Sequence, residues 1–232
     1  MFLSFLQATD VITEAMDMSH EAVVPTMSLF DMAVKGGPLM IPLLLLSIVA
    51  VYIFVERWVA IRKASIIDIH FMDRVKDCIH DGKIKAAMEL CERNIDKPIV
   101  RLIYKGLSRL GRPLSDIREA VENVGNAEVA RMERGLATLA TISGGAPMIG
   151  FLGTVLGMIE AFYNMASAGN SIDITLLSGG IYVAMVTTVA GLVVGIIAYF
   201  GYNYLTARIK SVVYKMDRTT IEFMDILNEP LE

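Results

Sequence analysis

Most side chains that could do chemistry within the apolar stretches of this sequence are hydroxyls. Thr154 and Thr188 each lie well inside a stretch without charged residues. Polar side chains are costly inside a bilayer and usually face a partner helix or a water-filled path. Glu160 follows Thr154 by six residues and is expected close to the membrane–water boundary on the external side. We interpret it as a proton entrance or a partner contact, with a simple water-exposed carboxylate as the alternative.

The two threonines are predicted to lie at one level of the membrane. From the expected start of each span, Thr154 lies about 8 Å and Thr188 about 10 Å from the outer edge of a core about 30 Å thick. The alternative is that each hydroxyl bonds a carbonyl of its own helix. This alternative fits Ser143 best, because Pro147 has no N–H to donate to the Ser143 carbonyl and bends the helix there. No acid, histidine or lysine lies in mid-span. A proton path here would therefore need a carboxylate from another chain.

Small residues accompany these hydroxyls at helical spacing. Glycines three or four residues apart allow two helix backbones to approach closely inside a membrane, where the hydrophobic effect cannot drive association. Antiparallel helices joined by a short loop are expected to pack together, and Pro147 is expected to bend the first of them. The alternative is a plain anchor with incidental glycines. The residues predicted to form this close packing are Gly150, Gly153, Gly157, Gly191 and Gly195.

The elements that must position these residues are three apolar helices. Charged residues are absent between Lys35 and Glu56, between Arg134 and Glu160, and between Asp173 and Arg208. About 20 apolar residues suffice to cross the hydrocarbon core. Hydrophobic residues make up 54% of the chain and mean hydropathy is +0.54, above the roughly 45–50% apolar content of soluble domains. The prediction is an all-α polytopic membrane protein.

Charge fixes the expected orientation. All Lys and Arg except Lys35 follow Glu56, and none lies between Arg134 and Arg208, so the positive-inside rule puts the N-terminus outside the cell membrane and the C-terminus in the cytoplasm. No cleavable signal peptide is expected. The predicted parts are an external arm with a short amphipathic helix (1–35), spans at 36–58, 135–163 and 177–205, a cytoplasmic helical domain (59–134), an external loop (164–176) and a cytoplasmic C-terminal helix (206–232).

The cytoplasmic domain is predicted to consist of helices. Its last helix is expected to be capped by Ser115 and to run without a break through the membrane. The third span is expected to continue into the cytoplasm as an amphipathic rod, and two long helices therefore enter the cytoplasmic bundle. The apolar positions of this rod are Leu205, Ile209, Val212, Met216, Phe223 and Ile226.

Several functions are disfavoured. The cytoplasmic segment gives too small a core for an enzyme pocket, and His70 and His80 are too far apart for a helical metal site. We therefore expect no catalytic residue, no metal site, no cofactor and no nucleic-acid partner. Cys78 and Cys91 are expected to be free thiols.

Two stretches resemble the signatures of a known family. Gly-Ala-Pro-Met-Ile-Gly-Phe-Leu-Gly-Thr-Val-Leu-Gly-Met-Ile (145–159) and Gly-Ile-Tyr-Val-Ala-Met-Val-Thr-Thr-Val-Ala-Gly-Leu (180–192) resemble the second and third spans of the ExbB/TolQ/MotA proton-channel family. The three-span layout is similar to its ExbB and TolQ branches. The resemblance implies a pentamer in the bacterial inner membrane, with the external arm and loop in the periplasm, around two copies of an ExbD/TolR-like protein whose single span carries a protonatable Asp. Proton flow would then energise an outer-membrane process through a TonB- or TolA-like protein.

By position, the resemblance makes Thr154 and Thr188 the pore threonines and Pro147 the proline of the second span. Val183 departs from the family, whose ExbB and TolQ members commonly have a Glu there, so any proton step assigned to that Glu is in doubt. Glu160 is a candidate substitute for it.

Three functions follow as hypotheses. The first is a proton-driven motor subunit, in which an ExbB-like transport role and a TolQ-like envelope role remain open and a MotA-like role is disfavoured because that branch has four spans. The second is a pentameric scaffold that does not conduct. A solute transporter is the weakest, because three spans without an internal repeat leave little room for a substrate site.

Overall fold

The computed structural model describes residues 36–65, 70–167 and 174–228, with side chains from 177 onward in the last range. The predicted N-terminal arm and its amphipathic helix lie outside these residues, as do residues 168–173 of the predicted loop at 164–176. Every element within the described ranges is a helix. Three of the helical segments are long and apolar enough to cross a membrane, which confirms the all-α polytopic fold.

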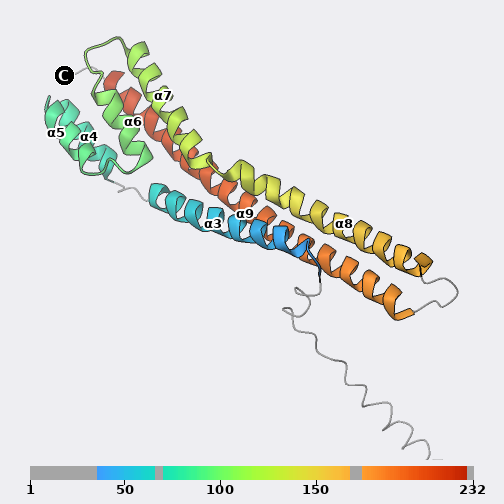
Figure 1. Cartoon of the computed structure of the whole chain (residues 1–232). Coiled ribbons are helices and arrows are strands. Elements are labelled where there is room, and N and C mark those ends of the chain that lie inside the picture. The colour runs from blue at the N-terminus through green and yellow to red at the C-terminus, as the bar shows by residue number, and fades with distance from the viewer. Residues whose placement is uncertain (1–35, 66–69, 168–173, 229–232) are drawn as a thin grey trace, which may run out of the picture.

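Three helices form the elongated part of the molecule (Figure 1). α8 (Leu136–Ser167) and α9 (Ile174–Asn228) lie side by side in opposite directions, and α3 (Met40–Ser65) packs against both. We call the end where α8 stops and α9 begins the far end, and the opposite end, which carries the shorter helices, the bundle end.

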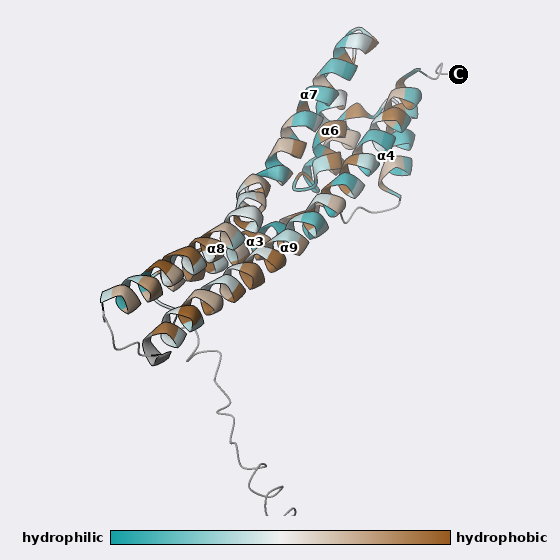
Figure 2. Cartoon of the chain, turned by 90° about the vertical axis from the view of Figure 1, so that its right-hand side faces the viewer, coloured by the Kyte–Doolittle hydropathy of each residue, from teal (hydrophilic) through white to brown (hydrophobic). Residues whose placement is uncertain are grey.

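Hydropathy divides the molecule along its length. The three long helices are mostly hydrophobic toward the far end, whereas polar residues dominate the bundle end (Figure 2). Large apolar side chains on the spans face outward, among them Ile41, Tyr52, Phe151, Ile197 and Phe200. This is the pattern expected when the surrounding solvent is lipid or a neighbouring membrane helix.

α3 begins later and ends later than the predicted span at 36–58. Gly37 has a φ of +72° and is followed by Pro38, so the chain turns here. The Met40 N–H donates to Gly37 O at 3.1 Å and closes this turn at the start of the helix. At the other end the helix continues past Trp58 to Ser65.

The predicted unbroken helix from the cytoplasmic domain into the membrane is wrong. α7 (Leu114–Glu133) is followed by Arg134, whose ψ is 129°, and by Gly135, which has a φ of +82°. Only glycine adopts that φ without a steric penalty, so the two residues form a joint between α7 and α8. The Ser115 cap is also wrong: the helix is preceded by Pro113, and the Ser115 hydroxyl donates to Asp116 Oδ1 instead.

The predicted continuation of the third span is confirmed. α9 is one helix of 55 residues and passes from the spans into the bundle. The six apolar positions expected to face inward are all buried: Leu205, Ile209, Val212, Met216, Phe223 and Ile226.

The bundle end is built from α4 (Phe71–His80), α5 (Ile84–Glu92), α6 (Pro98–Leu107) and α7, packed on the end of α9. Pro98 occupies the first turn of α6, as expected. Gly106 is required where α6 meets α9, because a β-carbon there would collide with the ring of Phe223. Cys91 is fully buried and Cys78 half-buried, and both are free thiols.

Candidate functional site

The candidate site is the interface between α8 and α9. Small residues on α8 face small residues on α9 along the whole length of the apolar part. A β-carbon added to Gly157 would lie 2.9 Å from Ala184 Cβ, and one added to Gly180 would lie 2.6 Å from Ala161 Cβ. Such spacing brings the two backbones into contact.

The two backbones meet directly at Gly150 and Gly191. A β-carbon on Gly191 would lie 2.6 Å from Ala146 O and 2.9 Å from Gly150 Cα. A β-carbon on Gly150 would lie 2.9 Å from Thr187 O. These neighbours are backbone atoms, which cannot rotate away as the end of a side chain can. The two glycines therefore fix both the separation and the register of the helices.

Pro147 lies against the same face of α9. The ring Cδ of Pro147 would be 2.6 Å from a β-carbon on Gly195, and Ser143 O would be 3.0 Å from it. Proline cannot donate to the carbonyl one turn back, so the Ser143 carbonyl loses its usual helical donor. Gly195 gives the proline ring and this carbonyl the room they need. The Ser143 hydroxyl donates to Ala140 O at 2.7 Å.

Thr188 links the two helices. Its hydroxyl donates to Gly150 O at 3.0 Å, and the side chain is half-buried. The hydroxyl oxygen can still accept a hydrogen bond. The Thr188 hydroxyl thus bonds across the helix pair, whereas the hydroxyls of Thr141, Ser143, Thr154 and Thr187 bond carbonyls of their own helix.

Thr154 does not share the level of Thr188. Thr188 lies opposite Gly150, and Thr154 is one helical turn, about 6 Å, further toward the far end. The Thr154 hydroxyl donates to Phe151 O at 2.6 Å, and its side chain is half-buried. The predicted offset of about 2 Å is therefore too small by about 4 Å, because the helix register follows the glycine contacts and not the ends of the apolar runs.

Thr187 is a site residue that the sequence did not single out. It is 1% exposed, and it is the one polar side chain among the described residues that is buried to this extent. A β-carbon on Gly153 would collide with its hydroxyl oxygen. The hydroxyl donates to Ala184 O at 2.8 Å, which satisfies it within the interface. Its position could have been found from the periodicity, since Thr187 lies one turn from both Ala184 and Gly191.

Glu160 and Val183 lie nearer the far end. Glu160 is exposed on α8, on the outside of the helix pair. Val183 is half-buried, and its Cγ1 would be 3.7 Å from a β-carbon on Gly37. Val183 thus faces the chain segment that leads into α3, while Gly153 and Gly157 face Thr187 and Ala184.

The fold and this site define a class. Three apolar helices, a closely packed helix pair and hydroxyls without a mid-span carboxylate describe a multi-pass membrane protein whose embedded polar groups can carry hydrogen bonds but no proton charge of their own. The family model described as the MotA/TolQ/ExbB proton channel family matches residues 94–218, more than half of the chain. The chain belongs to this family, which is one of channel subunits and not a known enzyme family.

Individual relatives of this chain carry ExbB names, in agreement with the family model. A protein of Synechocystis sp. named as ExbB-like 1 is 35% identical over 184 residues, covering 78% of this chain and 72% of the relative. An ExbB homolog of Methanothermobacter thermautotrophicus is 36% identical over 136 residues, covering 59% of this chain and 47% of the relative. The biopolymer transport protein ExbB of Neisseria gonorrhoeae is 32% identical over 139 residues, 54% of this chain and 63% of the relative. The chain thus spans about half the length of the archaeal relative.

Proposed function

We propose that the chain is the ExbB-like subunit of an inner-membrane proton-driven machine that energises biopolymer transport. Membership of the proton channel family and the names of the relatives support this role. The bundle end would lie in the cytoplasm, because the basic residues gather there. The predicted N-terminal arm and the segment between α8 and α9 would then lie in the periplasm.

The protonatable group would come from a partner. The middle of the three spans holds hydroxyls but no carboxylate, and a hydroxyl can relay a proton only next to a group that binds one. We infer a homopentamer that surrounds a dimer of an ExbD/TolR-like protein, whose Asp would face Thr154 and Thr188. A TonB-like protein would pass the resulting motion to the outer membrane. Glu160, exposed near the far end, would contact the partner or collect protons.

The observation that carries the proposal is the half-buried Thr188 hydroxyl, hydrogen-bonded to Gly150 O inside the membrane. This bond orients the hydroxyl and leaves its oxygen lone pair free to meet a proton carrier. The one-turn offset to Thr154 gives two hydroxyl levels along α8 and α9, which is useful to a partner helix that moves along the pore axis or turns within it.

The test is proton flux in vesicles that contain this chain and its ExbD-like partner. Thr188→Val keeps the shape of the side chain and removes the hydroxyl, so flux is expected to fall about tenfold, the equivalent of about 1.4 kcal/mol. Thr154→Val is expected to act in the same direction. Thr141→Val is the matched control, because this hydroxyl donates to Ala137 O at 2.9 Å near the bundle end. Undiminished flux in both Thr188→Val and Thr154→Val contradicts the assignment of these residues.

A non-conducting scaffold is the second candidate, favoured by Val183, where a carboxylate is common in the family. It predicts that an Asp→Asn change in the partner span leaves the function of the complex intact. The proton-channel proposal predicts that this change abolishes flux while the complex still assembles. A TolQ-like role in envelope maintenance is distinguished by the neighbouring genes, which would encode TolA-, TolB- and Pal-like proteins in place of a TonB-like one.

A further inference from the structure

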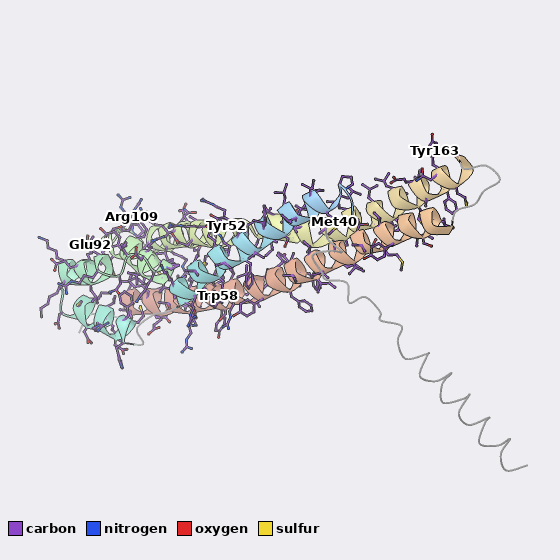
Figure 3. All side chains as sticks on the ribbon, turned by 60° about the horizontal axis from the view of Figure 1, so that its bottom comes forward. Met40, Tyr52, Trp58, Glu92, Arg109 and Tyr163 are labelled. Atoms are coloured by element: carbon purple, nitrogen blue, oxygen red, sulfur yellow. The ribbon has the colours of Figure 1, made fainter. Side chains whose placement is uncertain are left out.

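A cavity lined by two arginines lies where the spans meet the bundle end, between α3 and α9. It has a volume of about 500 Å³, and its lining includes Trp58, Arg62, Tyr204, Arg208 and Ser211. Figure 3 shows Trp58 at the part of α3 that is turned toward the bundle. Tryptophan and tyrosine prefer the boundary between the hydrocarbon and the headgroups, so the cavity opens at headgroup depth.

The cavity is positively charged. Arg62 and Arg208 line it, and no acidic residue does. The Arg62 guanidinium lies 5.5 Å from the centre of the Trp58 ring, and that of Arg208 lies 5.2 Å from the Tyr204 ring. Arg208 Nε also donates to the Tyr204 hydroxyl at 3.2 Å. Within the described ranges neither arginine forms an ion pair with a carboxylate, so two oriented guanidinium groups are available to an anion.

An apolar groove continues from this cavity toward the far end. It has a volume of about 420 Å³ and is lined by Val51, Phe54, Ile197 and Phe200, among others. Tyr204 lines both spaces, and its ring lies 6.4 Å from the ring of Phe54. A cavity with basic side chains and an apolar groove thus adjoin at the membrane boundary.

We propose that this composite site binds one anionic phospholipid, with its phosphate and acidic headgroup between Arg62 and Arg208 and an acyl chain along the groove. Guanidinium groups bind phosphate oxygens with paired hydrogen bonds, and the serine hydroxyl of Ser211 adds a further donor. The groove accepts a hydrocarbon chain and little else, because its walls are apolar. The lipid would join α3 to α9, two helices far apart in the sequence. The inference depends on membrane insertion and not on proton conduction.

The chain supplies its own reporter, because Trp58 is its single tryptophan. The full chain is placed in phosphatidylcholine vesicles, and a lipid with brominated acyl chains, which quench tryptophan fluorescence on contact, is added as phosphatidylglycerol or as phosphatidylcholine. Each basic residue near the membrane surface raises the affinity for an anionic lipid about fivefold over that for a neutral lipid. We expect brominated phosphatidylglycerol to quench Trp58 with an apparent affinity about 5- to 25-fold above that of brominated phosphatidylcholine.

The matched variants separate a site from general surface charge. Arg62→Gln with Arg208→Gln is expected to remove the preference. Lys63→Gln with Lys210→Gln removes the same charge at similar depth from exposed residues that do not line the cavity, and is expected to keep it. Far-ultraviolet circular dichroism checks that both double variants remain helical. Equal quenching by the two lipids in the unmodified protein, absence of quenching by either, or equal loss of preference in both double variants overturns the proposal.

Discussion

Replacement of Gly191 by alanine tests whether the α8–α9 contact is set by backbone approach. The added β-carbon would lie 2.6 Å from Ala146 O and 2.9 Å from Gly150 Cα, whereas ordinary contact begins at 3.4 Å. The helices must therefore separate by about 0.8 Å at this point. Overpacking against atoms that cannot rotate away costs up to about 3 kcal/mol. Alanine returns about 1 kcal/mol through its higher helix propensity, which leaves a net loss of about 2 kcal/mol.

The matched controls make the same chemical change where there is space. A β-carbon on Gly144 or on Gly179 would meet no atom within 4 Å, so Gly144→Ala and Gly179→Ala are expected to stabilise the protein by up to about 1 kcal/mol. The measurement is thermal unfolding in one detergent, followed by circular dichroism. A Gly191→Ala variant that unfolds at the same temperature as the two controls refutes the reasoning. The same variant should also weaken the adjoining hydrogen bond from Thr188 to Gly150, and so reduce proton flux.

Three further outcomes are expected. Gly106→Ala should destabilise the bundle end by about 1–3 kcal/mol, because the new methyl group meets the buried ring of Phe223; unchanged thermal unfolding would contradict this contact. Gly135→Ala should cost about 1–2 kcal/mol, because its φ of +82° is unfavourable for any residue with a β-carbon; a stabilised variant would mean that the helix runs unbroken. Burial raises the pKa of the Cys91 thiol to about 12, so at pH 8 the reactive thiolate is scarce. A maleimide reagent should then label Cys78 alone in the folded protein and both thiols after denaturation. Labelling of a folded Cys78→Ser variant would contradict the burial of Cys91.

The bundle end also has a charged contact that depends on neighbouring helices. Arg101 Nη1 lies 2.7 Å from Glu128 Oε1, and the two side chains are 24% and 13% exposed. This pair joins α6 to α7. The sequence shows both residues on helices, but their pairing depends on how the two helices pack.

The sequence by itself determined the elements that local patterns control. Three uncharged apolar runs, Pro98 at a helix start and the apolar repeat from Leu205 to Ile226 each need only neighbouring residues to be recognised. The hydrophobic effect and helix periodicity act on such runs wherever they fold. The family resemblance of 145–159 and 180–192 also stands on short contiguous stretches, and the match to residues 94–218 confirms it.

Only the tertiary structure decided how these elements meet. The sequence predicted small residues on both helices. The register, however, depends on backbone contacts between distant residues, and it places Thr188 opposite Gly150 instead of opposite Thr154. The joint at Gly135 depends on its positive φ and on the packing of α8 beside α3. Likewise, the cavity between Trp58 and Arg208 unites residues from α3 and α9. Each of these features is a relation between surfaces, and its energy exists only once the helices are packed.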